Sequence, residues 1–390
     1  MSDWRTKELG TLCTIQMGKT PARGNRKLWD TEKSSNNVWL SIADLEHGNE
    51  ISDSKEYISD TAAVSMKIVP KGTVMVSFKL SLGRTSFAAR DLYTNEAIAS
   101  LINLNTEIDK NYLYYYFTHF NWDKASESDI KVKGKTLNKA KLAKLPIRYP
   151  SLTQQKTIVS KLDNAFETID QAIANTETII ENITELRKSI LSSLLTEPNK
   201  PEYPLSEVCA LINGRAYSKE ELLDEGKYRV LRVGNLFTSK HWYYSDLELD
   251  DKKYIESGDL IYAWSASFGA RIWEEEKVIY HYHIWKVIPN TELVTKDFLY
   301  LLFEWDKERI TSSHGAGTTM IHVSKKSMEN RVLPIPNLKD QNRIVHDFKQ
   351  KNTKLNELEM NYRFKLGQLS ELKKSILNIA FKGQLISNKS

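Results

Sequence analysis

The feature that most constrains this chain of 390 residues is an internal duplication. Gly72 matches Gly258, and the same spacing then aligns the two halves of the chain over about 120 residues. The closest stretch is Glu-Leu-Arg-Lys-Ser-Ile-Leu at residues 185–191 against Glu-Leu-Lys-Lys-Ser-Ile-Leu at residues 371–377. Near the start of each half the spacing is larger, so the second half lacks about ten residues there. The chain is therefore predicted to fold as two copies of one unit.

Each copy is predicted to be a mixed α+β globular part followed by one long helix. The globular parts, roughly residues 1–150 and 200–336, carry short β-type runs such as residues 72–78. Aromatic segments of helical character follow these runs, at residues 112–120 and 298–305. Runs of strands with local helices of this kind are typical of the α+β class.

The long helices are predicted to begin just after Pro150 and Pro336. Ser151 and Asn337 are good N-cap residues, and each is followed three residues later by a side chain that comes close to completing a capping box. Each helix should run for about 44 residues. Steps of four and three place a mainly apolar stripe on each helix, which indicates a heptad seam. The stripes comprise Ile158, Leu162, Ala165, Ile169, Ala172, Thr176, Ile179, Ile183, Leu186 and Ile190, and Ile344, Phe348, Lys351, Leu355, Leu358, Tyr362, Lys365, Leu369, Leu372 and Ile376.

A helix of this length with one apolar stripe must bury that stripe against a partner. Its duplicate in the same chain is the natural partner, packed antiparallel, which gives a pseudo-twofold arrangement of two globular parts on a helical pair. The alternative is a coiled coil that dimerises the protein. The sequence favours the intramolecular pair because both helices come from one duplicated chain.

Composition narrows the class of protein without assigning a function. Charged residues make up 27% and hydrophobic residues 41% of the chain, which indicates a folded globular protein. No window is apolar enough for a membrane span and residues 1–5 carry no apolar signal segment, so a cytoplasmic location is expected. Cys13 and Cys209 fall at matched positions and suit neither a disulfide framework nor a metal site. The net charge of +5 is compatible with nucleic-acid binding.

Three motifs occur in a fixed order, and two of them are present in both copies. Gly-Lys-Thr-Pro at residues 18–21 precedes Trp-Leu-Ser-Ile-Ala-Asp-Leu at residues 39–45. A Leu-Pro-Ile triplet ends each globular part, followed by Gln155 in the first copy and Gln341 in the second. The third is Leu-Arg/Lys-Lys-Ser-Ile-Leu near the end of each long helix. Together these motifs resemble the specificity subunits of Type I restriction–modification systems over essentially the whole chain.

This resemblance implies an order of domains and a set of partners. Two target-recognition domains, residues 1–150 and 198–336, alternate with two conserved helical regions, residues 151–197 and 337–390. Such a subunit recognises double-stranded DNA and binds two modification subunits, which carry S-adenosylmethionine and methylate adenine. Restriction subunits, the motor-nuclease components that use ATP and magnesium, join for cleavage. The chain itself is expected to bind no cofactor.

The two copies differ where DNA reading is expected. Gly-Arg-Ala-Tyr at residues 214–217 replaces the Gly-Lys-Thr-Pro of the first copy, and the two globular parts share little sequence between the matched positions. This predicts two different half-sites and hence an asymmetric, bipartite target.

The sequence lacks the motifs of the chemistry that the partners would perform. No two prolines are adjacent, so the Asn/Asp-Pro-Pro-aromatic loop of adenine methyltransferases is absent, as is a phosphate-binding loop of the Gly-x-x-x-x-Gly-Lys-Ser/Thr type. The chain is therefore predicted not to be an enzyme.

Two alternatives remain open from the residues alone. Asp259, Glu275 and Lys277 loosely match the acidic-x-Lys arrangement of magnesium-dependent nucleases, although the first copy has no acidic counterparts. A coiled-coil adaptor that does not read DNA is the other. His281 and His283 could lie on one face of a strand, but no third metal ligand is nearby in sequence, which favours a packed or polar role over a metal site.

Base edges and phosphates are contacted by hydrogen-bond donors and cations on loops that reach a groove. Four places in the chain offer them: the loops after Gly18 and Gly214, the loops after the matched strands, a lysine-rich stretch with its counterpart in the second copy, and a short segment of the second copy. The predicted DNA-binding residues are Lys19, Thr20, Arg23, Arg215 and Tyr217 in the first place, Lys79, Ser81, Arg84, Trp264, Ser265 and Arg271 in the second, Lys133, Lys135, His314 and Thr318 in the third, and Arg232 and Asn235 in the fourth.

Overall fold

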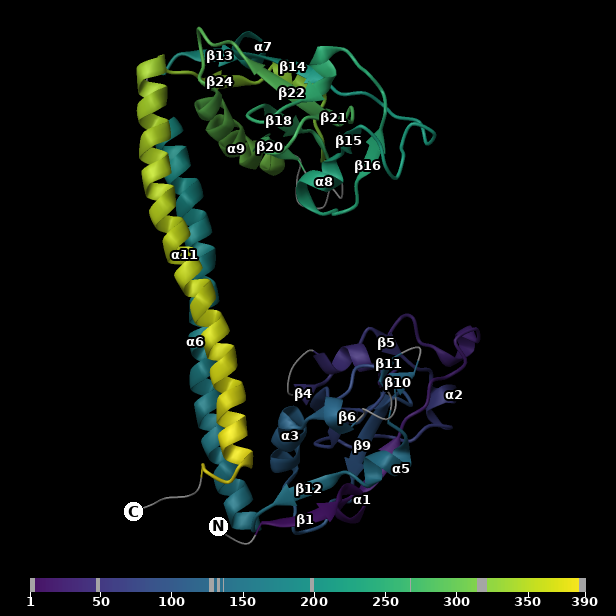
Figure 1. Ribbon diagram of the computed structural model, residues 1–390. Helices are drawn as coiled ribbons and strands as arrows, with labels where there is room; N and C mark the ends of the chain where they lie inside the picture. Colours follow the sequence, from purple (N-terminus) through teal and green to yellow (C-terminus); the bar gives the residue numbers. More distant parts are fainter. Residues whose placement is uncertain are drawn as a thin grey trace, which may run out of the picture. The chain divides into compact units, whose positions relative to one another are not determined.

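The computed structural model of the chain describes residues 4–46, 50–125, 130, 131, 134, 135, 137–196, 200–266, 268–313 and 321–385. It divides into two units (Figure 1). Unit 1 comprises Met1–Asn175 and Lys365–Ser390, and unit 2 comprises Thr176–Phe364. Each unit therefore contains one globular part, called here a head, together with a section of both long helices.

Head 1 contains a five-stranded sheet in the order β2-β9-β6-β7-β4 and a three-stranded sheet in the order β5-β3-β8. All pairs are antiparallel except β4 with β7 and β3 with β8. The elements are β1 Arg5–Glu8, α1 Leu9–Leu12, β2 Thr14–Met17, η1 Arg26–Leu28, β3 Val38–Leu40, η2 Ile42–Glu46, β4 Glu50–Ile51, β5 Glu56–Tyr57, α2 Asp60–Ala63, β6 Val74–Ser77, β7 Thr85–Ala88, β8 Tyr93–Thr94, β9 Ile98–Ile102, α3 Lys110–His119, α4 Trp122–Ala125, β10 Ile130–Lys131, β11 Gly134–Lys135, α5 Lys139–Ala143 and β12 Pro146–Tyr149.

Head 2 repeats this plan with two four-stranded sheets, β14-β22-β18-β20 and β16-β15-β21-β17. The pairing of β15 with β21 is parallel, as is that of its counterpart β3 with β8. The elements are β13 Glu202–Pro204, α7 Leu205–Val208, β14 Cys209–Asn213, β15 Tyr228–Leu231, α8 Val233–Phe237, β16 Tyr243–Ser245, η3 Asp251–Lys253, β17 Tyr254–Ile255, β18 Leu260–Ala263, β19 Ser265–Ala266, β20 Gly269–Ile272, β21 Val278–Tyr280, β22 Ile284–Pro289, α9 Lys296–Ser313, β23 Ile321–His322, α10 Lys325–Glu329 and β24 Val332–Pro334. The duplication predicted from the sequence is thus confirmed in the topology.

In each head, the first strand pairs antiparallel with the last: β1 with β12 in head 1 and β13 with β24 in head 2 (Figure 1). These are called here the closing strand pairs. The long helices, α6 Leu152–Leu195 and α11 Leu338–Phe381, begin directly after these pairs. The predicted caps form at both starts. The Gln154 amide N–H donates to the Ser151 hydroxyl oxygen at 3.4 Å, and the Asp340 amide N–H donates to the Asn337 side chain at 3.0 Å.

A fully buried glutamine links each head to the start of its long helix. The Gln155 side-chain nitrogen donates to the carbonyls of Glu107 and Pro150, both at 2.9 Å, and its oxygen accepts from the Asp109 amide at 2.9 Å. Gln341 makes the same three bonds in head 2, to residues 293, 336 and 295, over 2.7–2.8 Å. These bonds satisfy backbone groups that water cannot reach, so removing either side chain leaves three of them unpaired.

We expect Gln341→Met to lower the free energy of unfolding by about 2–4 kcal/mol, because methionine keeps the volume and loses the three hydrogen bonds. The measurement is urea unfolding of the full chain, with hydrogen–deuterium exchange at residues 293–300 as a local readout. Gln350→Met, at an exposed position of the same helix, is the matched control. Equal stability of the two variants would show that the glutamine link contributes nothing.

Within each unit, the sections of α6 and α11 lie side by side and antiparallel (Figure 1). In unit 2 the Arg187 side chain donates to Asn352 at 2.7 Å and to Asn356 at 2.8 Å, both on α11. In unit 1 the matched residue Lys373 forms an ion pair with Asp170 on α6 and lies over the Phe166 ring. The intramolecular antiparallel pair predicted from the sequence is confirmed, and the same cross-helix contact occurs once in each copy.

The predicted apolar stripe is wrong at Leu358, which is 42% exposed, and at Leu186 and Leu372, which are 49% and 46% exposed. The next residues, Arg187 and Lys373, are less exposed and make the cross-helix contacts instead. An α-helix has 3.6 residues per turn, so a stripe continued at a strict average of 3.5 drifts off the buried face. Ile169, Ile183 and Leu355 are buried as expected, and Ile190, Leu369 and Ile376 are half-buried.

Both long helices complete the core of each head. In head 1, Ile158 and Leu162 near the start of α6 and Leu377, Ala380 and Phe381 at the end of α11 join the main apolar cluster. In head 2, the same roles fall to residues at the start of α11 and the end of α6: Ile344, Val345, Phe348, Leu191, Leu194 and Leu195. None of the helices in the described part of the chain has the length and apolarity needed to cross a bilayer.

Candidate nucleic-acid interface

The candidate interface is organised by a matched turn in each head, called here central turn 1 (residues 95–97, between β8 and β9) and central turn 2 (residues 281–283, between β21 and β22). The Asn95 amide donates to the Leu40 carbonyl at 2.9 Å, and the His281 amide donates to the Leu231 carbonyl at 2.9 Å. The two turns therefore occupy the same place in the duplicated fold, at the join between the two sheets of each head.

The first predicted DNA-binding loops are fastened to these turns. The Lys19 amide donates to the Thr94 carbonyl at 2.9 Å, and the Arg215 amide donates to the Tyr280 carbonyl at 3.0 Å. The preceding glycine is required, because a Cβ at Gly18 would lie 1.9 Å from the Thr94 carbonyl oxygen. The glycine motifs found in the sequence thus serve to bring the loop close to the turn.

Central turn 2 gathers predicted residues from three of the four places. The Trp264 indole N–H donates to the Tyr282 carbonyl at 2.9 Å, and its ring lies edge-on to His283 with centroids 4.9 Å apart. Tyr217 stacks on His281 with centroids 6.5 Å apart. Loops that are far apart in sequence therefore meet at residues 281–283.

A cavity of about 380 Å³ opens beside central turn 2. Asn235 braces one side of it, because its side-chain oxygen accepts from the Arg232 amide at 3.0 Å and its nitrogen donates to the His241 carbonyl at 2.7 Å. The exposed Arg232 guanidinium lies over the Tyr243 ring at 5.4 Å. The lining residues are Arg232, Val233, Gly234, Asn235, Ser239, His241, Tyr243, His281 and His283. The cavity thus combines a cation, hydroxyl and imidazole donors, and an aromatic wall.

His281 is held neutral at the wall of this cavity. Burial lowers the pKa of His281 to about 4, and the neighbouring His283 and the charge of Arg232 act in the same direction. A neutral imidazole carries one donor and one acceptor, so it can pair with a base edge in either sense. It would not act as a fixed cation on phosphate at neutral pH.

The lowered pKa of His281 makes head 2 sensitive to acid. The unfolded chain, with an ordinary histidine pKa near 6.5, binds a proton that the folded head resists, so stability falls as the pH drops from about 6.5 towards 4. We expect His281→Asn, which installs the residue of central turn 1, to reduce this loss by about 1 kcal/mol between pH 7.5 and pH 5, after discounting for solvent screening. Urea unfolding at both pH values measures it, and a pH dependence identical to that of the parent chain would contradict it.

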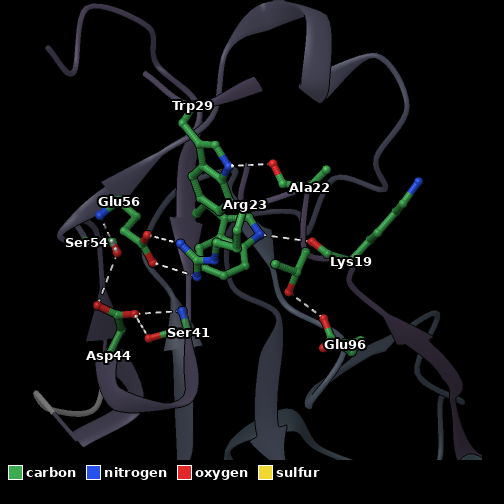
Figure 2. Close-up of polar contacts among 11 residues, drawn as sticks. Lys19, Ala22, Arg23, Trp29, Ser41, Asp44, Ser54, Glu56 and Glu96 are labelled. Atoms are coloured by element: carbon green, nitrogen blue, oxygen red, sulfur yellow. Dashed lines mark hydrogen bonds and ion pairs between the residues drawn. The ribbon is translucent and has the colours of Figure 1, made fainter. Parts of the chain in front are cut away.

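In head 1 the loop after Gly18 is held by aromatic and acidic partners (Figure 2). The Arg23 guanidinium forms an ion pair with Glu56 and lies 4.3 Å from the Trp29 ring centroid and 4.9 Å from that of Trp39. The Trp39 indole N–H donates to the Lys19 carbonyl at 3.0 Å. Arg23 would have to exchange its Glu56 contact to grip a guanine with both terminal nitrogens, so its predicted role in base reading stays a prediction.

Thr20 links the same loop to central turn 1. Its hydroxyl donates to a Glu96 carboxylate oxygen at 2.5 Å, and Lys79, from the loop after β6, adds its positive charge near that carboxylate. Two of the predicted DNA-binding loops therefore converge on Glu96 in head 1, as their counterparts converge on residues 281–283 in head 2.

The loop after β6 is braced from within by buried Ser77. Its hydroxyl donates to the Ser81 carbonyl at 2.5 Å and accepts from the Arg84 amide at 3.0 Å. The Arg84 guanidinium donates to the Ile42 carbonyl at 3.3 Å. Arg84 thus connects this loop to η2, and Lys79 and Ser81 lie half-buried on the loop itself.

The remaining predicted residues of head 2 differ in exposure and in the partners that they contact. Arg215 forms an ion pair with Glu221 at 2.6 Å, and Ser265 is buried on β19. Arg271 is exposed on β20 and lies over the Phe237 ring at 5.5 Å.

The lysine-rich stretch and its counterpart remain largely outside the structural description. Lys133, His314 and Thr318 lie outside the described residues, and Lys135 is described only through its backbone in β11.

The suggested nuclease residues do not converge. Asp259 pairs with Lys286 at 2.6 Å, Glu275 pairs with Arg229 at 2.9 Å, and Lys277 pairs with Glu256 at 2.9 Å. Across the described ranges, no three His, Cys, Asp or Glu side chains are grouped so that they could hold a metal ion. The arrangement is one of separate ion pairs, which does not favour the nuclease alternative.

Sequence reasoning missed the central position of Glu96, His241 and Tyr282. The sequence favoured a packed or polar role for His281 and His283, and Glu96 was not among the predicted residues because only hydrogen-bond donors and cations were sought. The available signal was the repeat itself, since Glu96 and Tyr282 are matched positions occupied by unlike residues.

The sequence and fold place the chain in a known family. The family model of the Type I restriction modification DNA specificity domain matches residues 1–185 and again residues 199–363. These matches cover most of the chain, which therefore belongs to this family. The predicted resemblance and the predicted fold class, two α+β heads joined by two long antiparallel helices, are confirmed.

Individual relatives agree with this assignment. The specificity subunit of the Type I restriction enzyme MjaIX from Methanocaldococcus jannaschii is 25% identical over 197 residues, which is 48% of this chain and 43% of that protein. The StySPI specificity subunit of Salmonella potsdam is 22% identical over 98% of this chain and 89% of its own length. The alignment with MjaIX thus spans less than half of that relative.

Two solved structures share the fold. A chain from a structural study of complex assembly and conformational transition in a type I R-M system has a TM-score of 0.76 at 16% identity, with 98% of both chains covered. The HsdS subunit of Thermoanaerobacter tengcongensis has a TM-score of 0.52 at 15% identity and covers 98% of this chain and 97% of its own. At this level of identity the likeness establishes the fold alone.

Proposed function

We propose that this protein reads an asymmetric, bipartite DNA sequence as the specificity subunit of a Type I restriction–modification complex, one half-site for each head. The observation that carries the proposal is the pair of central turns. In each head, matched loops meet at the central turn of that head. Central turn 1 presents Glu96, whereas central turn 2 presents Tyr282 between two histidines. Unlike side chains on like scaffolds suit two different half-sites.

In this proposal the chain supplies recognition and scaffolding, and its partners supply the chemistry. The paired helices hold two modification subunits that carry S-adenosylmethionine, and restriction subunits that use ATP and magnesium join them. The chain itself is non-catalytic, binds no cofactor and works on DNA in the cytoplasm. The family assignment supports these partners, and the separated ion pairs of Asp259, Glu275 and Lys277 are compatible with a non-catalytic role.

The first test replaces head 1 by a second copy of head 2, residues 5–149 by residues 202–335. The cut points lie side by side in the closing strand pairs, and the helix-end residues that join the two head cores are apolar in both copies: Leu191, Leu194 and Leu195 against Leu377, Ala380 and Phe381. With the partner subunits present, we expect a methylation-site map in which the head 2 half-site occurs twice and the head 1 half-site is lost.

The control for this exchange is the parent complex mapped in the same strain. A map in which both half-sites change, or in which neither changes, would contradict independent reading by the two heads. An exchanged chain that fails to assemble is recognised by its failure to copurify with the modification subunits, and the reciprocal exchange then provides the comparison.

The second test addresses catalysis. We expect the purified chain alone to transfer no methyl group from S-adenosylmethionine to DNA and to cut no DNA with magnesium. Radiolabelled methyl transfer and plasmid nicking are the measurements, with the complete complex as positive control. Magnesium-dependent cutting that is lost in Asp259→Asn would restore the nuclease alternative.

A further inference from the structure

Head 1 places a carboxylate at the centre of a surface that is expected to meet DNA phosphates. Glu96 is exposed on central turn 1, between the loop of Lys19 and Thr20 and the loop of Lys79. Like charges repel, so a carboxylate here weakens binding to any DNA backbone unless it also makes a favourable contact with a base. We propose that Glu96 reads an exocyclic amino group in the major groove, cytosine N4 or adenine N6, and so sets one base of the half-site of head 1.

The position of Glu96 is fixed from two sides. The Thr20 hydroxyl donates to its carboxylate at 2.5 Å, and the Lys19 amide of the same loop holds the Thr94 carbonyl two residues before it. The Asn95 amide is bonded to the Leu40 carbonyl at the adjoining sheet. A side chain that is held in this way loses little entropy on binding and can discriminate between bases.

The carboxylate is charged and has acceptor capacity to spare. Burial acts to raise the pKa of Glu96, but the hydrogen bonds from Thr20 and the charge of Lys79 outweigh it, so the pKa lies below its ordinary value. Within the described part of the chain, Glu96 forms no ion pair. A carboxylate accepts at about four positions, and it cannot donate.

An acceptor without a donor selects a particular base edge. Cytosine offers its N4 amino group in the major groove, and adenine offers its N6 amino group, whereas guanine O6 and thymine O4 would repel a carboxylate at the same place. Lys79 beside it can contact the adjacent phosphate and offset the charge of Glu96. The matched residue of head 2 is Tyr282, so this preference belongs to head 1 alone.

The test uses Glu96→Gln in the complete complex with its modification subunits. Glutamine keeps an oxygen that can accept the Thr20 hydrogen bond, but it exchanges the charge and one acceptor for an amino donor. The probe is a library of duplexes randomised across the half-site of head 1. We expect the preference at one position to shift towards adenine by roughly 5- to 150-fold, because glutamine accepts from adenine N6 and donates to N7, while the other positions and the half-site of head 2 are kept.

Binding to random-sequence DNA provides a second readout. Removing the charge should leave this binding unchanged or tighten it, so a change of preference confined to one base position separates base reading from a general effect of charge. A purely structural role for Glu96 predicts an unaltered base preference, since the Thr20 bond survives. Glu50→Gln removes an exposed carboxylate from β4 of the same head and is the matched control, for which no position should change.

Base analogues separate the two sources of the amino group. Pyrimidin-2-one in place of cytosine, or purine in place of adenine, removes the amino group and should weaken binding by the parent complex at the position that Glu96→Gln alters. An analogue that leaves binding by the parent complex unchanged at that position would overturn the inference. It rests on the proposed function, yet the two can fail separately: a parent complex without sequence preference refutes the function, whereas an unchanged map for Glu96→Gln beside a successful head exchange refutes only the role of Glu96.

Discussion

The heads depend on apolar contact with the ends of both long helices. Phe381, near the end of the described chain, packs against Tyr112 and Tyr116 with ring centroids 5.4 and 5.5 Å apart and stacks on His119. Burying one aromatic side chain contributes about 1.5–3 kcal/mol, which is large beside the stability of a domain. Head 1 therefore completes its core only when α11 is in place. The loops that meet at central turn 1 are positioned by that core.

The seam between the helices is polar at its matched positions, and this has a structural consequence. Arg187 bonds Asn352, Asn356 and Glu359, the last at 3.1 Å. An apolar seam tolerates sliding by a turn, whereas half-buried polar groups lose their partners if the register shifts. The contacts of Arg187 and of Lys373 thus define the register of the helices, each in its own unit. Apolar contacts in their place, such as Leu186 or Leu372 would make, would define the register less well.

Much of the fold could be predicted because the duplication tests each pattern twice. The caps at Ser151 and Asn337, the α+β heads and the antiparallel helical pair all followed from matched residues. The seam failed at Leu186 because apolarity was taken as the sign of burial, and a long arginine can bury its stem while its charged end finds partners. The buried role of Gln155 and Gln341 was also beyond the sequence, since a matched glutamine does not show which backbone groups it will satisfy.

The candidate site was predictable as a set of loops and not as a geometry. The glycine motifs and basic residues pointed to loops that meet at the central turns, because close backbone approach favours glycine and DNA binding favours positive charge. Their meeting point at the central turns depends on the parallel pairing of β3 with β8 and of β15 with β21, which joins strands about 50 residues apart.

Basic residues alone could not have shown how the two heads differ in what they read. Cations attract every DNA sequence, so discrimination between sequences must come from groups that make favourable contacts with bases and not with phosphates. In the proposed function Glu96 and the neutral His281 are such groups, and the scaffold places them on the central turns, where the two copies share a backbone position and differ in their side chains. A duplicated fold can in this way keep its architecture constant while its specificity changes, because the residues that hold the turn and the side chains that face the ligand are different residues.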